Sequence, residues 1–212
     1  MNILVISAHP DDEVLGMGGT IKKLSKKNKI HLCVVTEGAS AQYTDKKMIE
    51  IRKNACYKAG KILGISTFHF LDFPDMLLDT IPHLEINKKL ENVFSKVKPE
   101  IVFTTPPNDL NLDHQKVFES TLVCARPLSS NVKKIYFYEI PSYKIKSFEP
   151  TTFIDISKEL SFKIKAFNCY KSEIRKFPHP RSKKAIENLS TYRGILSGVK
   201  NAEAFRLIRE VI

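Results

Sequence analysis

The stretch "ISAHPDDEVLGMGG", residues 6–19, determines how this sequence is interpreted. It completes a run of four apolar residues, 3–6, and such near-continuous runs are typical of strands buried on both faces of a parallel sheet. The run ends in His9, Pro10 and three consecutive acids, Asp11 to Glu13. Packing alone does not require these polar residues at the end of a buried strand, so the stretch indicates a functional site.

Strand-like and helix-like segments alternate along the rest of the chain. We expect strands at 2–7, 31–36, 67–73, 101–105, 134–139 and 152–156. We expect helices at 14–27, 47–63, 84–97, 113–125, 158–173 and 182–197, while 205–212 fits either a strand or a helix. This alternation predicts an α/β fold, a Rossmann-like and mostly parallel sheet with helices on both faces. No change in composition divides the chain, so residues 1–212 are expected to form a single domain.

Two polar clusters follow the first and fourth expected strands, and ligands of open α/β sheets bind beyond such strand ends. The second cluster is "PPNDLNLDH", residues 106–114. Either cluster alone could be a polar turn with a capping aspartate. Together, His9, Asp12 and His114 offer two imidazoles and a carboxylate, and three such ligands with one open position are typical of catalytic zinc.

The acids beside Asp12 have separate expected roles. Asp11 is adjacent to an expected ligand but not part of the set, so it is the candidate general base that takes a proton from water. Glu13 falls in the first turn of the expected helix, where a negative charge interacts favourably with the backbone amides.

Composition excludes several classes of protein. No apolar run reaches the roughly 20 residues that span a bilayer, and the start of the chain does not resemble a secretion signal. The four cysteines are scattered and are interpreted as reduced thiols, which favours the cytoplasm. The net charge of +11 fits a lysine-rich surface or attraction of an anionic substrate. The sequence contains no stripe of basic residues interleaved with aromatic residues, so it does not indicate nucleic-acid binding.

These motifs resemble the PIG-L/LmbE-like zinc-dependent N-deacetylases, which act mainly on compounds that contain N-acetylglucosamine. The first motif, "AHPDDE" at 8–13, is the most specific, and the later "DH" at 113–114 supports it. Weaker similarities extend over nearly the whole chain. They are "TEGAS" (36–40), Arg52 with "AGKILG" (59–64), "FPDM" (73–76), "HPRS" (179–182) and "YRGILSGVKNAEAF" (192–205).

The resemblance implies a role for each matching residue. His9, Asp12 and His114 would be zinc ligands, and Asp11 the general base. Arg52 and Asp75 fall where relatives contact the sugar. Asp113 would lie behind the ligands and orient His114 or a proton relay.

The sequence departs from the family at Asn111, where many relatives carry a histidine that stabilises the intermediate or donates a proton. An asparagine amide can donate a hydrogen bond to an oxyanion but cannot act as a histidinium acid. Asp11 would then return the proton, or another group such as His179 would supply it. Arg181, in the same "HPRS" segment, is a candidate for binding an anionic part of the substrate, or a surface ion pair.

The expected activity is hydrolytic removal of an acetyl group from an N-acetylated amino sugar, with zinc, or another divalent ion such as iron, as cofactor. The alternatives are a different metal-dependent hydrolase and a non-catalytic carbohydrate-binding relative. The expected partner is a small sugar substrate, free or linked to a nucleotide or phosphate. Neither a nucleic-acid partner nor a transmembrane segment is expected. The sequence is compatible with a homo-oligomer.

Overall fold

The apolar run that follows Met1 forms the central strand β1 (Asn2–Ser7) of a seven-stranded sheet in a computed structural model, which describes residues 1–142 and 147–212. The other strands are β2 (Lys29–Thr36), β3 (Thr67–Phe73), β4 (Ile101–Thr104), β5 (Lys134–Tyr138), β6 (Thr152–Asp155) and β7 (Ala202–Glu210). The helices are α1 (Asp12–Leu24), α2 (Lys47–Leu63), α3 (His83–Val97), α4 (Leu112–Cys124), α5 (Leu160–Phe167) and α6 (Lys183–Ser197). A short 3-10 turn, η1 (Leu78–Thr80), precedes α3.

The strand order β3-β2-β1-β4-β5-β7-β6 places β1 between β2 and β4. The first five strands of this order run parallel, and β7 pairs antiparallel with both β5 and β6. The chain therefore winds outward in opposite directions on the two sides of β1. This is the switch point at which ligands bind in open α/β sheets. Residues that follow β1 and β4 consequently lie side by side at the carboxyl edge of the sheet.

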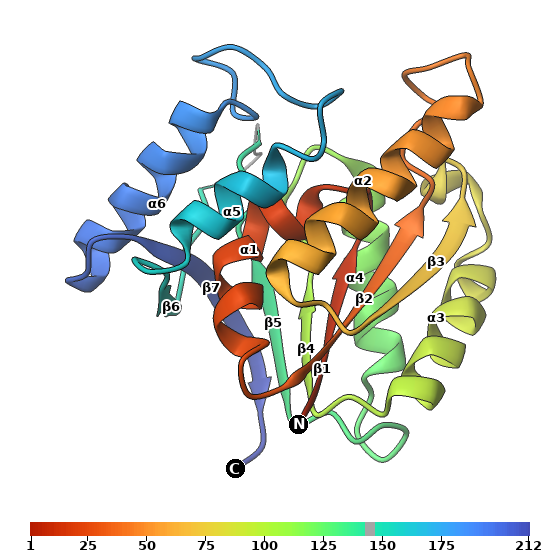
Figure 1. Cartoon of the computed structure of the whole chain (residues 1–212). Helices are drawn as coiled ribbons and strands as arrows, with labels where there is room; N and C mark the ends of the chain where they lie inside the picture. The colour runs from red at the N-terminus through yellow and green to blue at the C-terminus, as the bar shows by residue number, and fades with distance from the viewer. Residues whose placement is uncertain (143–146) are drawn as a thin grey trace.

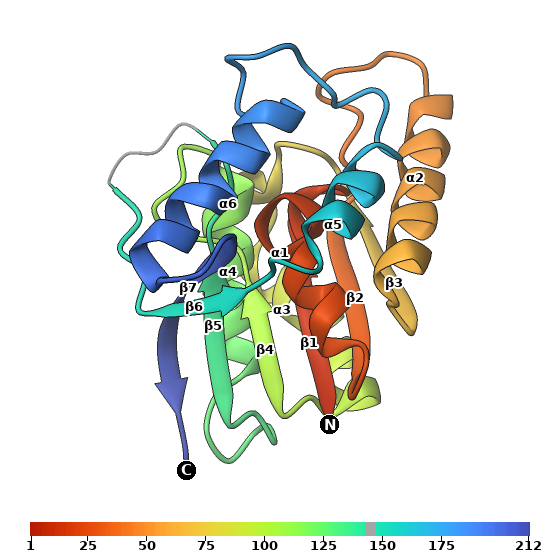
Figure 2. The same ribbon diagram turned by 60° about the vertical axis from the view of Figure 1, so that its left-hand side comes forward.

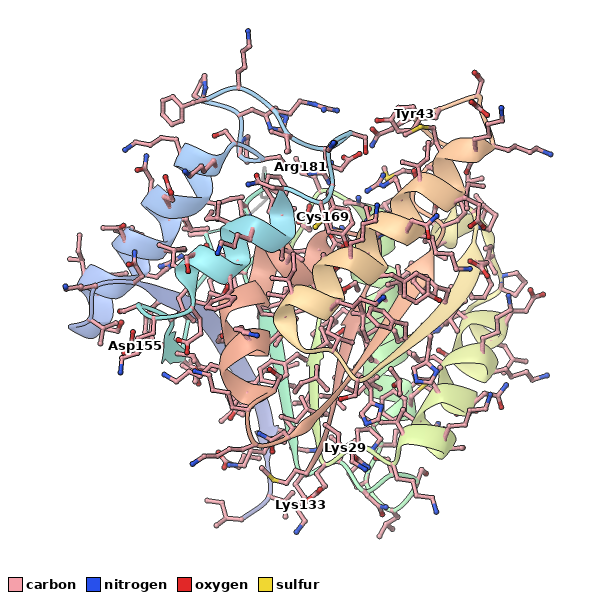
Figure 3. The ribbon with its side chains drawn as sticks, in the orientation of Figure 1. Lys29, Tyr43, Lys133, Asp155, Cys169 and Arg181 are labelled. Carbon is pink, nitrogen blue, oxygen red and sulfur yellow. The ribbon has the colours of Figure 1, made fainter. Side chains whose placement is uncertain are left out.

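Helices cover both faces of the sheet (Figures 1 and 2), as the alternation of segments predicts. Alternate residues of β1 pack into two cores, because successive side chains of a strand point to opposite faces. Ile3 and Val5 join the core under α1, α2 and α5, whereas Leu4 and Ile6 join the core under α3 and α4. All four are at most 1% exposed. Arg181 lies at the end of the molecule opposite Lys29 and Lys133 (Figure 3).

Helix α1 is interrupted at Met17, whose φ of −147° and ψ of 26° are not helical. The interruption frees backbone amides in the middle of the helix, and the buried Glu203 of β7 accepts hydrogen bonds from Gly19 N at 3.0 Å and Thr20 N at 2.7 Å. Lys163 of α5 neutralises this carboxylate with its Nζ 2.7 Å from Oε1. A strand near the C-terminus therefore stabilises the helix that carries the first motif.

Most expected elements are present, with ends that shift by one to three residues, and two differ more. The helix expected at 158–173 ends at Phe167, because the chain then turns to bury Tyr170 beneath α1. The last segment is the strand β7, which begins at Ala202. Among the helices of residues 1–142 and 147–212, none has the length and apolar character needed to cross a membrane.

Candidate functional site

The loop after β1 is held in a sharply defined shape. Asp12 Oδ2 accepts a hydrogen bond from the backbone amide of His9 at 2.8 Å, and the Thr36 side chain donates to the carbonyl of Ala8 at 2.8 Å. Gly38, with a φ of +65°, packs so closely that a side chain there would meet Pro10 at 2.4 Å. These contacts direct the side chains of His9 and Asp12 to one point at the edge of the sheet.

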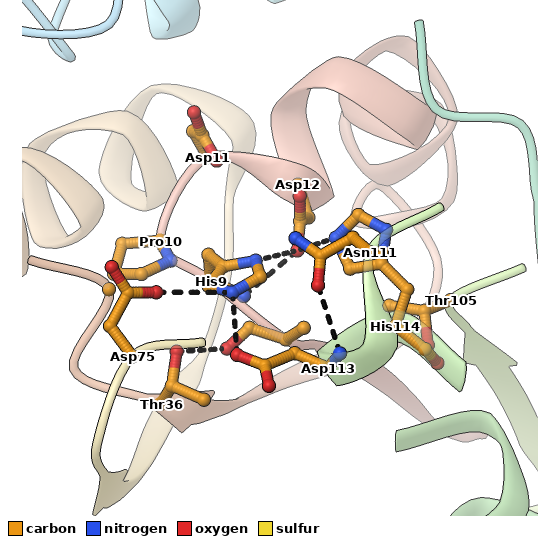
Figure 4. Close-up of polar contacts among 12 residues, drawn as sticks. His9, Pro10, Asp11, Asp12, Thr36, Asp75, Thr105, Asn111, Asp113 and His114 are labelled. Atoms are coloured by element: carbon orange, nitrogen blue, oxygen red, sulfur yellow. Dashed lines mark hydrogen bonds and ion pairs between the residues drawn. The ribbon is translucent and has the colours of Figure 1, made fainter. Parts of the chain in front are cut away.

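His9, Asp12 and His114 form one cluster (Figure 4), although the loop after β1 and the first turn of α4 are far apart in the sequence. Asp12 Oδ2 is 3.4 Å from His9 Nδ1 and 3.3 Å from His114 Nε2. The ligand atoms of the three residues all lie within 4.8 Å of one another, and all three side chains are buried. Two imidazole nitrogens and a carboxylate in this arrangement match the donors that zinc prefers.

A second layer of carboxylates engages the outer nitrogen of each imidazole. Asp113 Oδ2 is 3.0 Å from His9 Nε2, and Asp109 Oδ2 is 3.1 Å from His114 Nδ1. Metal-binding histidines almost always donate their outer N–H to such a partner, which fixes the tautomer and the direction of the ring. Asp113 therefore lies against His9 and not against His114, the partner that the sequence suggested first.

The electrostatics of the cluster favour a cation. Burial alone would lower the pKa of His9, but Asp113, Asp12 and Asp75 raise it to about 10. Burial likewise opposes the protonated form of His114, yet Asp12 and Asp109 raise its pKa to about 9. The two imidazoles in turn hold the pKa of Asp12 well below its usual range, against the effect of burial. A divalent cation could replace the two protons that this field retains.

Unsatisfied polar atoms add to this fit. Among the described residues, Asp12 Oδ1 and Asp75 Oδ2 are buried without a hydrogen-bond partner. Buried polar atoms are rarely left unpaired, because a missing partner costs roughly 1–3 kcal/mol. The donor set and these vacant acceptors together fit a bound metal ion.

A second grouping of His9 with Asp75 and Asp113 also has ligand-like spacing. Asp113, however, already accepts hydrogen bonds from the backbone amides of Met76 at 2.8 Å and Leu78 at 3.0 Å, besides its contact with His9. The Asp113 carboxylate oxygens are therefore already engaged in contacts that hold η1 against α4. The set of His9, Asp12 and His114 is therefore the better candidate for a metal site.

Asp11 lies apart from this cluster in Figure 4, in a separate charged environment. Its Oδ2 is 3.8 Å from Arg52 Nη2 and 3.7 Å from Arg181 Nε. Glu173 balances both arginines, at 3.6 Å from Arg52 Nη1 and 2.7 Å from Arg181 Nη1. Burial raises the pKa of Asp11 to about 6, although Arg181 and Arg52 oppose the rise. A carboxyl group of this kind can exchange a proton near neutral pH.

The two residues that the family resemblance links to sugar binding lie in different settings. Arg52 is 2% exposed, and its guanidinium donates to the carbonyls of Gly38 and Pro10, which makes it a clamp between two loops. Asp75 lies at the cluster itself, with Oδ1 3.2 Å from His9 Nε2. Burial raises the pKa of Asp75, and His9 and Arg52 oppose this.

Asn111 and His179, the two residues considered for proton donation or oxyanion binding, are also separated. Asn111 is the N-cap of α4, and its Oδ1 accepts a hydrogen bond from Asp113 N at 2.9 Å. This bond leaves the amide nitrogen of Asn111 available as a donor beside His114 (Figure 4). His179 Nδ1 accepts from the Arg181 backbone amide at 3.0 Å, a contact within its own turn.

The sequence did not reveal three residues of this site: Asp109, Tyr170 and Glu173. Asp109 belongs to a quoted motif, and its position five residues before His114 could have suggested a partner for that ring. Tyr170 and Glu173 lie in a segment expected to be helical, and no local pattern links them to Asp11, some 160 residues away. Their roles follow from tertiary contacts alone.

Comparison with known proteins identifies the family. The model of the PIG-L family, described as GlcNAc-PI de-N-acetylase, matches residues 4–125, more than half of the chain. An uncharacterized deacetylase, YaiS, from Escherichia coli K12 is 31% identical, with 80% of this chain and 90% of the relative covered. Diacetylchitobiose deacetylase from Thermococcus kodakarensis is 26% identical, with 97% and 82% covered.

Solved structures share the fold at lower identity. The N,N'-diacetylchitobiose deacetylase of Pyrococcus horikoshii aligns with a TM-score of 0.82 at 24% identity, over 98% of this chain and 83% of that one. GalB, a 4-carboxy-2-hydroxymuconate hydratase from Pseudomonas putida KT2440, aligns with a TM-score of 0.83 at 22% identity, over 100% and 98%. Because one fold carries both activities, the fold alone does not define the reaction. The family match and the similarity to YaiS together show that this chain belongs to the PIG-L family of de-N-acetylases.

Proposed function

We propose that this protein is a metal-dependent N-deacetylase that hydrolyses the acetamide of an N-acetylated amino sugar and releases acetate and a free amine. The observation that carries the proposal is the buried cluster of His9, Asp12 and His114. The buried Asp11 precedes Asp12 in the chain, and its carboxyl group faces Arg52 and Arg181 outside the ligand set. Family membership and the deacetylases among its relatives support the reaction class.

His9 Nδ1, one Asp12 oxygen and His114 Nε2 would hold the metal, with Asp113 and Asp109 orienting the two rings. A divalent metal in this position would polarise the acetamide carbonyl and make water a stronger acid. Two nitrogens and one carboxylate favour zinc, and iron is the main alternative because affinity does not fix the metal taken up in the cell.

Asp11 is the proposed general base. It removes a proton from the attacking water as the new bond to the carbonyl carbon forms. Its pKa of about 6 suits it to accept that proton at neutral pH and to release it again. When the carbon–nitrogen bond breaks, the leaving nitrogen must gain a proton, and Asp11 can return the one that it took.

Asn111 is the proposed donor to the oxygen that becomes negative in the tetrahedral intermediate. Its own carbonyl oxygen is bound by Asp113 N, so its amide group is oriented before substrate arrives. Such preorganised donors stabilise an oxyanion. His179 is a weaker candidate for the acid, because burial, Arg181 and Arg175 lower its pKa and favour the neutral ring.

Substrate recognition is proposed to involve Asp75 and Arg181. Asp75 has an unpaired buried oxygen that could accept a sugar hydroxyl. Arg181 is 28% exposed and thus accessible, whereas Arg52 would act on substrate through the loops that it joins. Because Asp11 and Glu173 already balance both arginines, the attraction of this site for an anionic group is reduced. The overall charge of +11 therefore does not by itself define an anionic substrate.

We further propose that residues 1–212 act as one domain in a reducing compartment such as the cytoplasm. The four cysteines are unpaired, and three of them are buried. Disulfides are rare in such compartments, and the large cores on both faces of the sheet need none.

The experiment is an assay of acetate and free amine with the purified, metal-loaded protein. The panel contains N-acetylglucosamine, diacetylchitobiose, and nucleotide-, phosphate- and acid-linked derivatives. We expect equimolar acetate and amine from at least one member and no product after chelation. A protein that binds these sugars tightly but releases no acetate would instead be a carbohydrate-binding relative.

A further inference from the structure

Asp11 has an unusual backbone. Its φ of +125° and ψ of −25° lie in a region that residues with side chains rarely occupy. Such conformations persist only when the surrounding structure enforces them, and they cluster at functional sites. The direction of the Asp11 carboxylate depends on this backbone, so the contacts that enforce it matter for any reaction at Asp11.

Glu13 is the side chain that contacts this backbone. Its Oε2 accepts a hydrogen bond from the Asp11 amide at 3.1 Å, and its Oε1 accepts one from the Tyr170 hydroxyl at 2.5 Å. Glu13 is 0% exposed and Tyr170 is 1% exposed. The carboxylate is thus clamped between the base-bearing residue and a tyrosine from the segment that follows α5.

The contacts to Asp11 divide into two kinds. Arg52 and Arg181 face its carboxylate and set its charge environment. Glu13 contacts its main chain, and the Asp11 carbonyl is fixed from the other side by the amides of Val14 and Leu15 at 3.0 and 2.9 Å. The main-chain contacts determine where the carboxylate points.

We propose that Glu13 and Tyr170 form a positioning pair that holds Asp11 in its strained conformation and so aims the general base. Only the predicted loss of kcat rests on the proposed deacetylase function. The conformational part can be tested without any reaction. Tyr170 lies outside the segment that the family model matches, so this support comes from a different part of the chain.

Three variants test the pair, and a fourth serves as a control. Glu13→Leu removes both acceptor oxygens, and kcat should fall about 100-fold, the effect of misplacing a reacting group by about 1 Å. Glu13→Gln keeps an acceptor for the Asp11 amide, so its loss should stay below about tenfold. Tyr170→Phe removes one hydroxyl and should lower kcat about tenfold. KM and the metal content should remain near the wild-type values in all three.

Tyr138→Phe is the matched control. Its buried hydroxyl donates to the carbonyl of Ile6 at 2.9 Å. This variant should lose similar thermal stability but retain kcat. If Tyr170→Phe behaves like this control, or if Glu13→Gln loses as much kcat as Glu13→Leu, the positioning role is wrong.

Crystal structures of Tyr170→Phe and Glu13→Gln give a second readout, independent of activity. We expect a shifted Asp11 backbone in Tyr170→Phe and a nearly unchanged one in Glu13→Gln. An Asp11 φ that stays near its wild-type value in Tyr170→Phe, together with full kcat, would overturn the proposal. If the wild-type protein deacetylates no substrate, the proposed function fails, while the crystal structures still decide whether the pair holds Asp11.

Discussion

Two buried charged clusters in this molecule differ in how completely their atoms are paired. Around Glu203, the carboxylate accepts from two backbone amides and from Lys163, and Arg193 nearby donates two hydrogen bonds to Glu139 at 2.8 Å each. Around His9, buried oxygens of Asp11, Asp12 and Asp75 lack partners among the described residues. The charged groups of the first cluster pair with one another and with backbone amides as the chain folds, whereas the second contains carboxylate oxygens that a bound cation and substrate could satisfy.

The pairing of buried atoms distinguishes a charged cluster that supports the fold from one that belongs to the candidate site, without use of sequence motifs. Both clusters are buried and both contain acidic residues, so burial and composition do not distinguish them. Carboxylate oxygens without a hydrogen-bond partner do distinguish them. Among the described residues, buried oxygens of this kind occur only in Asp11, Asp12 and Asp75, and a buried polar atom without a partner is costly. Substitutions in the cluster around His9 should therefore lower activity, whereas substitutions in the cluster around Glu203 should lower stability.

The strongest test of the functional cluster is Asp11→Asn. Removing the general base should lower kcat about 1,000-fold, since such catalysis contributes roughly 10²–10⁴-fold. The metal content should stay unchanged, because Asp11 lies outside the ligand set. Acetate-release kinetics and elemental analysis measure the two effects, and an activity near the wild-type value would remove Asp11 from its role.

The strongest test of the structural cluster is Lys163→Met. It leaves Glu203 as an unpaired buried charge, and the free energy of unfolding should fall by about 3–5 kcal/mol. Urea denaturation measures this loss, and metal affinity should not change in the folded protein. Lys23→Met is the control, because the Lys23 ammonium donates to the Asp155 carbonyl at the surface, and its effect should stay within about 0.5 kcal/mol. Similar losses in both variants would contradict the assignment.

Substitutions of Asp113 and Asp109, whose carboxylates contact the two histidine rings, should have effects of intermediate size. Asp113→Asn and Asp109→Asn should each weaken metal binding about 10- to 100-fold, because each removes the charge that orients an imidazole. Competition with a chelating dye measures the affinity. Asp79→Asn, at an exposed position in η1, should leave it unchanged. Equal affinities in all three variants would show that the outer carboxylates do not support the metal.

A more gradual effect is a pH dependence of stability in the metal-free protein. His9 and His114 have folded-state pKa values of about 10 and 9, above the unfolded value of 6.5. Their contribution is complete below pH 6.5 and is lost as the pH rises toward 9–10, at about 1.4 kcal/mol per pH unit for each of the two imidazoles. Saturating metal should abolish this decline, since the ion replaces both protons. Thermal melts with chelator and with metal measure it, and parallel curves would argue against a shared proton and metal site.

The sequence was sufficient for the architecture because each element carries its own signal. The apolar run 3–6, the helical spacing of 47–63 and the strand at 67–73 all appear as expected. The metal cluster was predictable as well, because parallel strands bring their carboxyl ends to one edge, and His9 and His114 each follow such a strand.

The supporting residues were not predictable in the same way. Glu203 and Tyr170 act on residues about 160–180 positions earlier, and Glu173 pairs with Arg52 about 120 positions earlier. The sequence around each residue gives no indication of these partners. Arg52 was expected near the sugar, and its burial between two backbone carbonyls emerges only in three dimensions. Local patterns predict which atoms meet at a strand end but not which distant side chains hold them there.

The dependence of α1 on Glu203 has a consequence for biogenesis. The loop with His9 and Asp12 is synthesised almost 200 residues before Glu203, whose carboxylate caps the interrupted helix behind the loop. Nascent chains generally fold from the N-terminus, yet here the metal-binding loop would gain its rigid support only when β7 inserts between β5 and β6. Metal acquisition would then follow the synthesis and insertion of β7.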